Sequence, residues 1–229
     1  TEMGTIMFEH KIQYDFPEAV KKEADEIAKR QIPAEEIAKR KDFRNVLTFT
    51  IDPETAKDFD DALSYQVLPD GKIELGVHIA DVSYFVRPGS AIDTEAKERA
   101  TSVYLVDRTI PMLPEVLSNG LCSLVPNQDR LTFGAVFILD RNGKVHDKWF
   151  GKTIIHSNQR FTYEEVDKIL ETGQGTLVKE LMDVNDIAKK IRAERFAKGA
   201  IALDSDDVKF KLDETGKPIG IIRTVPTDS

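Results

Sequence analysis

The chain has 229 residues, of which 41% are hydrophobic and 31% charged, and this balance excludes a disordered or fibrous protein. Its length suits one large domain or one and a half ordinary domains. The formal net charge of -8 argues against a free-standing nucleic-acid-binding protein, whose surface is usually basic. That objection is weaker for a site whose acidic residues hold metal cations, because the cations change the local charge.

The sequence carries no sign of a membrane or secretory protein. No apolar stretch approaches the roughly 20 residues that cross a bilayer, and the first residues lack the basic and then apolar layout of a signal peptide. The single cysteine, Cys122, excludes an internal disulfide and fits a reducing, cytoplasmic location. We expect Cys122 to be a small buried residue rather than a reactive thiol.

Two helices are predicted near the N-terminus. Residues 16–30 place small and apolar side chains at helical spacing behind Pro17, and a shorter helix should begin after Pro33. Because both segments are thin in large apolar residues, we expect both helices on the surface. Residues 1–41 are therefore interpreted as a polar, helical lead-in to the domain that follows.

The middle of the chain has the composition of a β-sheet. Residues 46–51 are β-branched and aromatic, which is typical of a strand. Three hairpins are also expected, with turns around Asp70-Gly71, around residues 140–143 and around residues 214–216. Asp-Gly between two apolar runs is a strong turn signal.

Helices and one irregular segment are expected between and after the hairpins. Residues 90–105 are predicted as a helix that runs out into an extended segment, whereas residues 108–128, rich in Pro, Asn and Gly, should be irregular. A helix that starts at the capping box of Thr162 and Glu165 and a long amphipathic helix over residues 176–198 complete the set. Without a repeated βαβ rhythm, these elements predict an α+β fold with a mostly antiparallel sheet and flanking helices.

Four aspartates lie within ten residues, directly after the first predicted strand: Asp52, Asp58, Asp60 and Asp61. Such charges repel one another unless they stay apart in water or a cation holds them together. Short carboxylates converging from one loop suit Mg²⁺ or Mn²⁺. Two such ions about 3.5–4 Å apart can clamp the attacking and leaving oxygens of a phosphoryl transfer.

The aspartates alone leave this question undecided. An acidic surface loop is the commonest meaning of a run such as residues 58–61. An EF-hand calcium loop fits poorly because, counting from Asp58, the required glycine position holds Leu63 and the closing glutamate position holds Pro69. A carboxylate pair for glycoside hydrolysis would be acceptable in principle, but nothing else in the sequence suggests a sugar site.

Longer motifs are more specific than the aspartates. The stretches TIDPETAKDFDDAL, GVHIADVSYFV, ATSVYL and PMLPEVLSNGLCSL closely resemble the catalytic domain of the ribonuclease II/ribonuclease R family, the RNB family, and the ribonuclease R branch fits best. Residues 1–41 resemble the segment that joins the family's cold-shock-like domains to the catalytic domain. Residues 42–229 are therefore expected to be the N-terminal part of that domain, truncated at its C-terminal end.

The resemblance implies a hydrolase: a processive 3′–5′ exoribonuclease that degrades RNA to nucleoside 5′-monophosphates with Mg²⁺, for which Mn²⁺ can substitute. By matching positions, Asp52, Asp58, Asp60 and Asp61 would be catalytic and metal-binding, with Asp60 sharing most directly in the chemistry. Tyr104 would stack on a base at the 3′ end of single-stranded RNA, a contact that tolerates any sequence. Discrimination against DNA would rest on the 2′-hydroxyl.

Other polar residues near these motifs are given no catalytic role. His78 is expected to be structural, and Asp81 to support the aspartate loop from behind. Arg99, Arg108 and Arg130 are expected to be solvated rather than bound to phosphate.

The chain also lacks parts of the family pattern. An arginine and a glutamate that complete the family's site have no counterpart here, and neither do the cold-shock-like and S1 domains that grip RNA, so we expect the fragment itself to be inactive or nearly so. The alternative is a non-catalytic RNA-binding or scaffolding relative, whose mark would be loss of one of the four aspartates. A plain acidic interaction module is a third hypothesis. We expect RNA as the partner, with no membrane and no obligate protein partner.

Overall fold

The computed structural model describes residues 5, 7, 9–10, 12–105, 108–201, 207–213 and 218–224. Its helices are α2 (Glu18–Ala28), α3 (Ala34–Ala38), α4 (Val82–Phe85), α5 (Ala91–Arg99), the π-helix η1 (Val116–Leu121), α6 (Tyr163–Thr172) and α7 (Val178–Ala197). Its strands are β1 (Lys41–Phe43), β2 (Leu47–Asp52), β3 (Asp61–Val67), β4 (Ile73–Ala80), β5 (Val103–Tyr104), β6 (Thr109–Ile110), β7 (Asp129–Leu139), β8 (Val145–His156), β9 (Gln159–Thr162), β10 (Asp207–Leu212) and β11 (Pro218–Thr224). Among the helices of these ranges, none combines the length and the apolar character that a membrane span requires.

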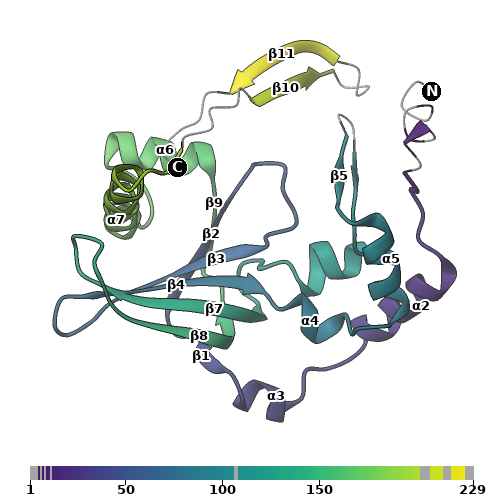
Figure 1. Ribbon diagram of the computed structural model, residues 1–229, viewed down its shortest axis with the longest axis horizontal. Coiled ribbons are helices and arrows are strands. Elements are labelled where there is room, and N and C mark those ends of the chain that lie inside the picture. The colour runs from purple at the N-terminus through teal and green to yellow at the C-terminus, as the bar shows by residue number, and fades with distance from the viewer. Residues whose placement is uncertain are drawn as a thin grey trace.

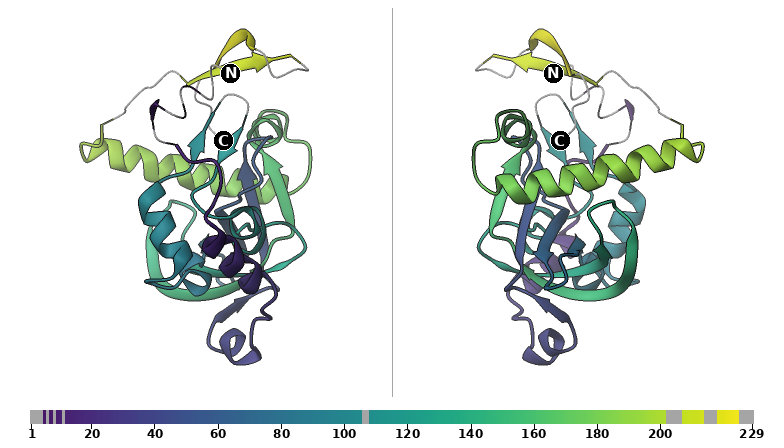
Figure 2. Two further views of the ribbon diagram at one scale, coloured as in Figure 1. Left: turned by 90° about the vertical axis from the view of Figure 1, so that its right-hand side faces the viewer. Right: turned by 90° about the vertical axis from the view of Figure 1, so that its left-hand side faces the viewer.

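Seven strands form one curled, mixed sheet in the order β1-β8-β7-β4-β3-β2-β9 (Figure 1). The four inner pairs are antiparallel, whereas the edge strands β1 and β9 run parallel to β8 and β2. Helices α6 and α7 lie towards one side of the sheet and α2, α4 and α5 towards the other, and α7 extends across the width of the molecule in Figure 2. The predicted α+β fold, with a mostly antiparallel sheet and flanking helices, is confirmed.

Two hydrophobic cores hold these helices to the sheet. The first core joins strand residues such as Phe43, Ala62 and Ile155 to α2, α5 and η1. The second joins Phe49 and Phe161 to α6 and α7, and these two rings meet edge to face with their centroids 5.9 Å apart. Strand β2, which leads into the aspartates, is therefore anchored through Phe49 before the acidic stretch begins.

Helix α2 is more deeply packed than its composition suggested. Val20, Ala24 and Ile27 are buried in the first core, whereas seven of the other eight residues are exposed, so the helix lies on the surface as expected but with one face packed inwards. The few apolar side chains of the helix share one face, and that face contacts α5 and η1. Helix α3 contains no buried residue within Ala34–Ala38, as expected for a surface element.

The three predicted hairpins are present as β3–β4, β7–β8 and β10–β11, although the turn at residues 214–216 lies outside the described residues. Two short strands of the main sheet and two short helices, α4 and η1, were not predicted. Strands β1 and β9 are three and four residues long and pair with strands far away in sequence. The π-helix η1 lies inside residues 108–128, so the expectation of a wholly irregular segment is wrong.

Two predictions about side chains are confirmed. The Thr162 hydroxyl accepts the backbone N–H of Glu165 at 3.1 Å, and the Glu165 carboxylate accepts the backbone N–H of Thr162 at 2.8 Å, so a capping box begins α6. Cys122 is buried, and burial raises the pKa of its thiol to about 12, which keeps the thiol protonated and unreactive at neutral pH.

A buried ion pair ties α3 to the sheet. The Arg40 guanidinium is fully buried and donates to Asp81 at 2.7 Å and to Glu36 at 2.6 Å. The other terminal nitrogen of Arg40, Nη1, donates to the carbonyl oxygens of Thr132 and Thr153. Asp81 therefore fixes α3 against the sheet, and the expectation that it supports the aspartate loop is wrong.

A row of buried polar side chains crosses the sheet at His78. The imidazole lies 2.9 Å from the Ser64 hydroxyl on β3 and 3.0 Å from the Thr153 hydroxyl on β8. Glycines leave room for the ring: a Cβ at Gly76 would lie 2.6 Å from Nε2, and one at Gly134 would lie 3.0 Å from Nδ1. His78 is fully buried within this row, as expected for a structural residue.

This environment predicts acid sensitivity of folding. Burial lowers the pKa of His78 to about 4, so the folded protein keeps the ring neutral, whereas the unfolded chain takes up a proton near pH 6.5. The contribution of His78 to stability is complete above pH 6.5 and falls as the pH drops towards 4, by about 3 kcal/mol in total. Urea unfolding between about pH 7.5 and pH 4.5 should show a steeper loss for the wild type than for His78→Gln. Parallel curves for the two proteins would contradict this prediction.

Candidate functional site

The four aspartates occupy the junction between two paired strands. Asp52 is the last residue of β2 and Asp61 the first residue of β3, with Asp58 and Asp60 in the loop that joins them. Because β2 and β3 pair antiparallel, the end of one strand lies beside the start of the other. Figure 1 shows this loop projecting from the sheet in the space between α6 and β5.

The second half of the loop is fixed by hydrogen bonds to residues that follow η1. The backbone N–H of Phe59 donates to the Ser123 hydroxyl at 3.0 Å, and that hydroxyl donates to the carbonyl of Lys57 at 2.7 Å. The carbonyl of Phe59 accepts the N–H of Leu124 at 2.9 Å, and the carbonyl of Asp60 accepts the N–H of Ala80 at 3.0 Å. The backbone on both sides of Asp58 is therefore held in place.

Arg160 fixes the first half of the loop and was missed by sequence reasoning. It lies on β9, beside β2, and its guanidinium donates to the carbonyl of Pro53 at 2.7 Å and of Glu54 at 3.1 Å. The same guanidinium lies 5.6 Å from the centroid of the buried Phe59 ring. No local signal marks Arg160, because β9 is only four residues long and lies far from the loop in sequence.

The carboxylates influence one another through space. Burial raises the pKa of Asp52, the nearby Thr50 hydroxyl and the charge of Arg160 lower it, and the negative charges of Asp61 and Asp58 raise it further. Asp60 lies at the surface, but partial desolvation and the charges of Asp58, Asp61 and Asp52 also raise its pKa. Within the described residues, Oδ2 of Asp52 is buried without a hydrogen-bond partner. The site therefore concentrates negative charge that the protein does not neutralise.

The aspartates are close enough to affect one another's pKa, but among the described residues they do not form a complete set of metal ligands. Across the described part of the chain, no group of three or more His, Cys, Asp or Glu side chains stands in a metal-binding arrangement. The structure thus brings the four aspartates into one region, within electrostatic range of one another, and leaves their convergence on a shared cation as a prediction.

Two tyrosines flank the aspartates. Tyr104, on β5, has 68% of its surface exposed, and its hydroxyl donates to Oδ2 of Asp58 at 3.0 Å. Tyr163, the first residue of α6, was not singled out from the sequence. Tyr163 follows Thr162, which pairs with Asp52 across β2 and β9, and partial burial and the charges of Asp52 and Asp61 raise its pKa.

The arginines near the motifs have different environments. Arg99 stacks 3.8 Å from the centroid of Phe16 and pairs with Glu95, so the expectation that it is solvated is wrong. Arg130 is half-buried and donates to the carbonyl of Ser123 at 2.8 Å, which makes it structural as well. Arg108 is exposed, as expected.

Comparison with known proteins agrees with the motifs. The model of the RNB domain matches residues 40–229. DIS3-like exonuclease 2 of Schizosaccharomyces pombe is 48% identical over 82% of this chain, and ribonuclease R of Thermotoga maritima is 44% identical over 91%. The structure of Mycoplasma genitalium RNase R in complex with ribose-methylated single-stranded RNA superimposes with a TM-score of 0.90 at 32% identity over 99% of this chain.

The matched relatives are longer and differ in activity. This chain spans 22% of the S. pombe protein, 30% of the T. maritima protein and 36% of the M. genitalium chain. One relative from Arabidopsis thaliana, 42% identical over 84% of this chain, is named an inactive exonuclease. The division of the chain into residues 1–41 and 42–229 stays a prediction. Since the family model covers residues 40–229, with ribonuclease R among the similar proteins, the chain belongs to the RNB-domain family of exoribonucleases.

Proposed function

We propose that the protein containing this chain is a Mg²⁺-dependent exoribonuclease. It removes nucleotides processively from the 3′ end of single-stranded RNA and releases nucleoside 5′-monophosphates. The observation that carries the proposal is the group of four aspartates at the junction of β2 and β3 in a chain of the RNB family. Because the chain spans a minority of its relatives' length, this activity is proposed for the whole protein, and residues 1–229 alone are expected to be inactive or nearly so.

The aspartates suit a divalent cation by their chemistry. Carboxylate oxygens are the ligands that Mg²⁺ prefers, and the buried, unpartnered oxygen of Asp52 is available to such an ion. In this proposal Asp52, Asp58 and Asp61 mainly hold metal, and Mn²⁺ can replace Mg²⁺. When bound, the metal stabilises negative charge on the oxygens of the phosphodiester.

Asp60 has the most direct part in the proposed reaction. Water attacks the terminal phosphodiester, and Asp60 accepts the proton that the water loses. The bond from phosphorus to the 3′ oxygen of the preceding nucleotide breaks, and that oxygen takes a proton from solvent to become the 3′-hydroxyl of the shortened RNA. Partial desolvation and then the neighbouring carboxylates raise the pKa of Asp60, which makes its carboxylate a stronger base than an isolated aspartate. Its backbone is held by Ala80, so the side chain extends from a fixed point.

Tyr104 is proposed to stack on a base at the 3′ end. Its ring is exposed, and the bond from its hydroxyl to Asp58 fixes the ring beside the aspartates before RNA arrives. A stacking contact accepts every base, as general RNA degradation requires.

The second candidate is a non-catalytic RNA-binding relative. The A. thaliana relative named an inactive exonuclease supports this alternative. The presence of all four aspartates in this chain supports the enzyme instead. The two candidates differ in whether RNA is shortened or only bound.

Metal binding by residues 1–229 can be measured directly. Calorimetric titration with Mn²⁺ should detect a site that Asp58→Asn or Asp61→Asn weakens about tenfold or more, because each change removes one carboxylate ligand. The matched control is Asp147→Asn, which alters an exposed aspartate on β8. Equal Mn²⁺ binding by all three variants and the wild type would identify the acidic stretch as an ordinary surface loop.

Cleavage and RNA binding should separate in the full-length protein. Asp60→Asn should abolish shortening of single-stranded RNA and leave its affinity nearly unchanged, because the side chain keeps its size and loses its basicity. Continued nucleotide release by Asp60→Asn would exclude the proposed role of Asp60.

Tyr104→Ala should weaken binding of single-stranded RNA about five- to 150-fold, corresponding to about 1–3 kcal/mol of lost stacking. Tyr104→Phe should retain most of the RNA affinity.

Arg160 should act through the shape of the loop. Arg160→Ala removes charge-assisted hydrogen bonds to two loop carbonyls and should lower the free energy of unfolding by about 1.5–3 kcal/mol. Amide hydrogen exchange at residues 54–59 should become faster, and RNA cleavage by the full-length protein should fall more than RNA binding. Arg160→Lys should lie between the wild type and Arg160→Ala. The control is Arg192→Ala on the exposed face of α7, and matching exchange rates in the two alanine variants would contradict this role.

A further inference from the structure

A cavity of about 270 Å³ adjoins the aspartate loop on the side of Asp58. Its walls come from three segments far apart in sequence: the loop itself, the residues before α2, and the stretch from β6 through η1. Asp60 and Tyr104, which carry the proposed chemistry and stacking, are not among the lining residues. The volume is near the lower end of the roughly 300–1,000 Å³ of small-molecule pockets. A volume slightly below that range limits the cavity to a small ligand and excludes a strand.

One residue of the cavity wall, Ser118, has a hydroxyl that is itself buried beneath the wall. Oγ of Ser118 is buried and, within the described part of the chain, makes no hydrogen bond. Asn119 follows it on the same wall. Both belong to η1, and π-helical turns are frequent at functional sites. A buried hydroxyl without a partner costs stability unless a ligand or water satisfies it.

The charges of the cavity favour a ligand with two kinds of polar group. Lys57 and Arg108 supply positive charge suited to phosphate, while Asp58 and Glu115 supply carboxylates that accept hydrogen bonds. The two signs balance, so the cavity is not a simple anion site. A nucleotide meets both demands, because it carries a phosphate together with hydroxyl or amino donors.

An exposed aromatic ring completes the lining. Tyr14 has 54% of its surface exposed, and the Arg108 guanidinium lies 5.9 Å from the centroid of its ring. A base can stack on such a ring whatever its identity.

We propose that this cavity binds a single nucleoside 5′-monophosphate, the product released at the neighbouring aspartates. The inference rests on the proposed exoribonuclease function, which supplies that product. Lys57 and Arg108 bind the phosphate, Ser118 and Asn119 bind the sugar or base edge, and Tyr14 stacks on the base. Because Asp58 lines the cavity, the product reaches this site by a short movement from the place where it forms.

Binding of 5′-AMP to residues 1–229, measured by calorimetry without divalent metal, tests the inference. Adenosine and inorganic phosphate should each bind at least about tenfold more weakly than 5′-AMP, because each satisfies only one part of the cavity. Inorganic phosphate binding as tightly as 5′-AMP, or absence of 5′-AMP binding by folded protein, would overturn the proposal.

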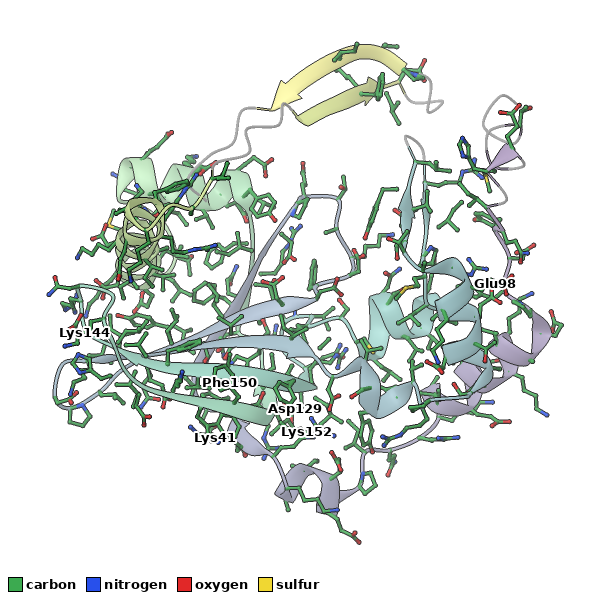
Figure 3. All side chains as sticks on the ribbon, in the orientation of Figure 1. Lys41, Glu98, Asp129, Lys144, Phe150 and Lys152 are labelled. Carbon is green, nitrogen blue, oxygen red and sulfur yellow. The ribbon has the colours of Figure 1, made fainter. Side chains whose placement is uncertain are left out.

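Variants locate the site. Lys57→Ala and Ser118→Ala should each weaken 5′-AMP binding several-fold or more, whereas Lys144→Ala should not. Lys144 is a matched control because it lies in the turn of the β7–β8 hairpin, at the far side of the molecule from α5 in Figure 3. Amide chemical shifts of the wild type provide a reading that needs no substitution: 5′-AMP should shift Lys57, Ser118 and Asn119. Shifts confined to other residues, or unchanged affinity in well-folded Lys57→Ala and Ser118→Ala, would refute the assignment.

The outcome is separable from that of the proposed function. Asp60→Asn should retain 5′-AMP binding, since Asp60 does not line the cavity. If the full-length protein cleaves RNA but Lys57→Ala and Ser118→Ala leave the affinity for 5′-AMP unchanged, this inference alone is refuted. Cavity-dependent 5′-AMP binding without RNA cleavage would refute the exoribonuclease alone.

Discussion

The pairing of β2 with two neighbours is the constraint on which the candidate site depends. Antiparallel pairing with β3 and parallel pairing with β9 fix where β2 ends, and therefore where Asp52 and Asp61 stand. The same β9 delivers Arg160 to the carbonyls at the start of the loop. Short, polar residues that would be mobile in isolation are thus held by a rigid sheet, as is common for functional loops.

The electrostatics of the site follow from that placement. A sheet end that gathers four carboxylates creates repulsion that folding alone does not relieve, and burial of Asp52 adds to it. The positive charge of Arg160 lowers the pKa of Asp52 and so partly offsets this repulsion. The hydrogen bonds described for its guanidinium, however, go to backbone carbonyls and not to an aspartate. The fold therefore leaves a local excess of negative charge at this end of the sheet. Cations bound there would offset that charge, so the net charge of -8 does not by itself exclude contact with an anionic polymer.

Prediction from sequence succeeded where the signal was local. Asp70-Gly71 marked a hairpin and Thr162 with Glu165 marked the start of α6, because turns and caps are specified by a few adjacent residues. Prediction failed where partners are distant: β1 and β9 exist only through parallel pairing, and the packing of one face of α2 depends on its contacts with α5 and η1. The aspartates were identified by a family resemblance, since their spacing alone also fits a surface loop. Arg160 could not be predicted because it lies about 100 residues from the loop that it contacts. The cavity beside Asp58 could not be predicted because its lining comes from three separate parts of the chain.

The burial of Arg40 bears on where this domain begins. A boundary between residues 41 and 42 looks natural from the sequence, yet a chain cut there loses the one guanidinium that fills the space between Asp81 and the carbonyls of Thr132 and Thr153. Asp81 would keep the Ser83 hydroxyl and Lys152, whose Nζ lies 3.6 Å away, but it would lose its fully buried counter-ion. Removing one member of a buried ion pair costs about 3–5 kcal/mol in comparable proteins. The domain therefore needs at least Arg40 from the lead-in, and a shortened protein that unfolds would reveal a missing counter-ion rather than a missing domain.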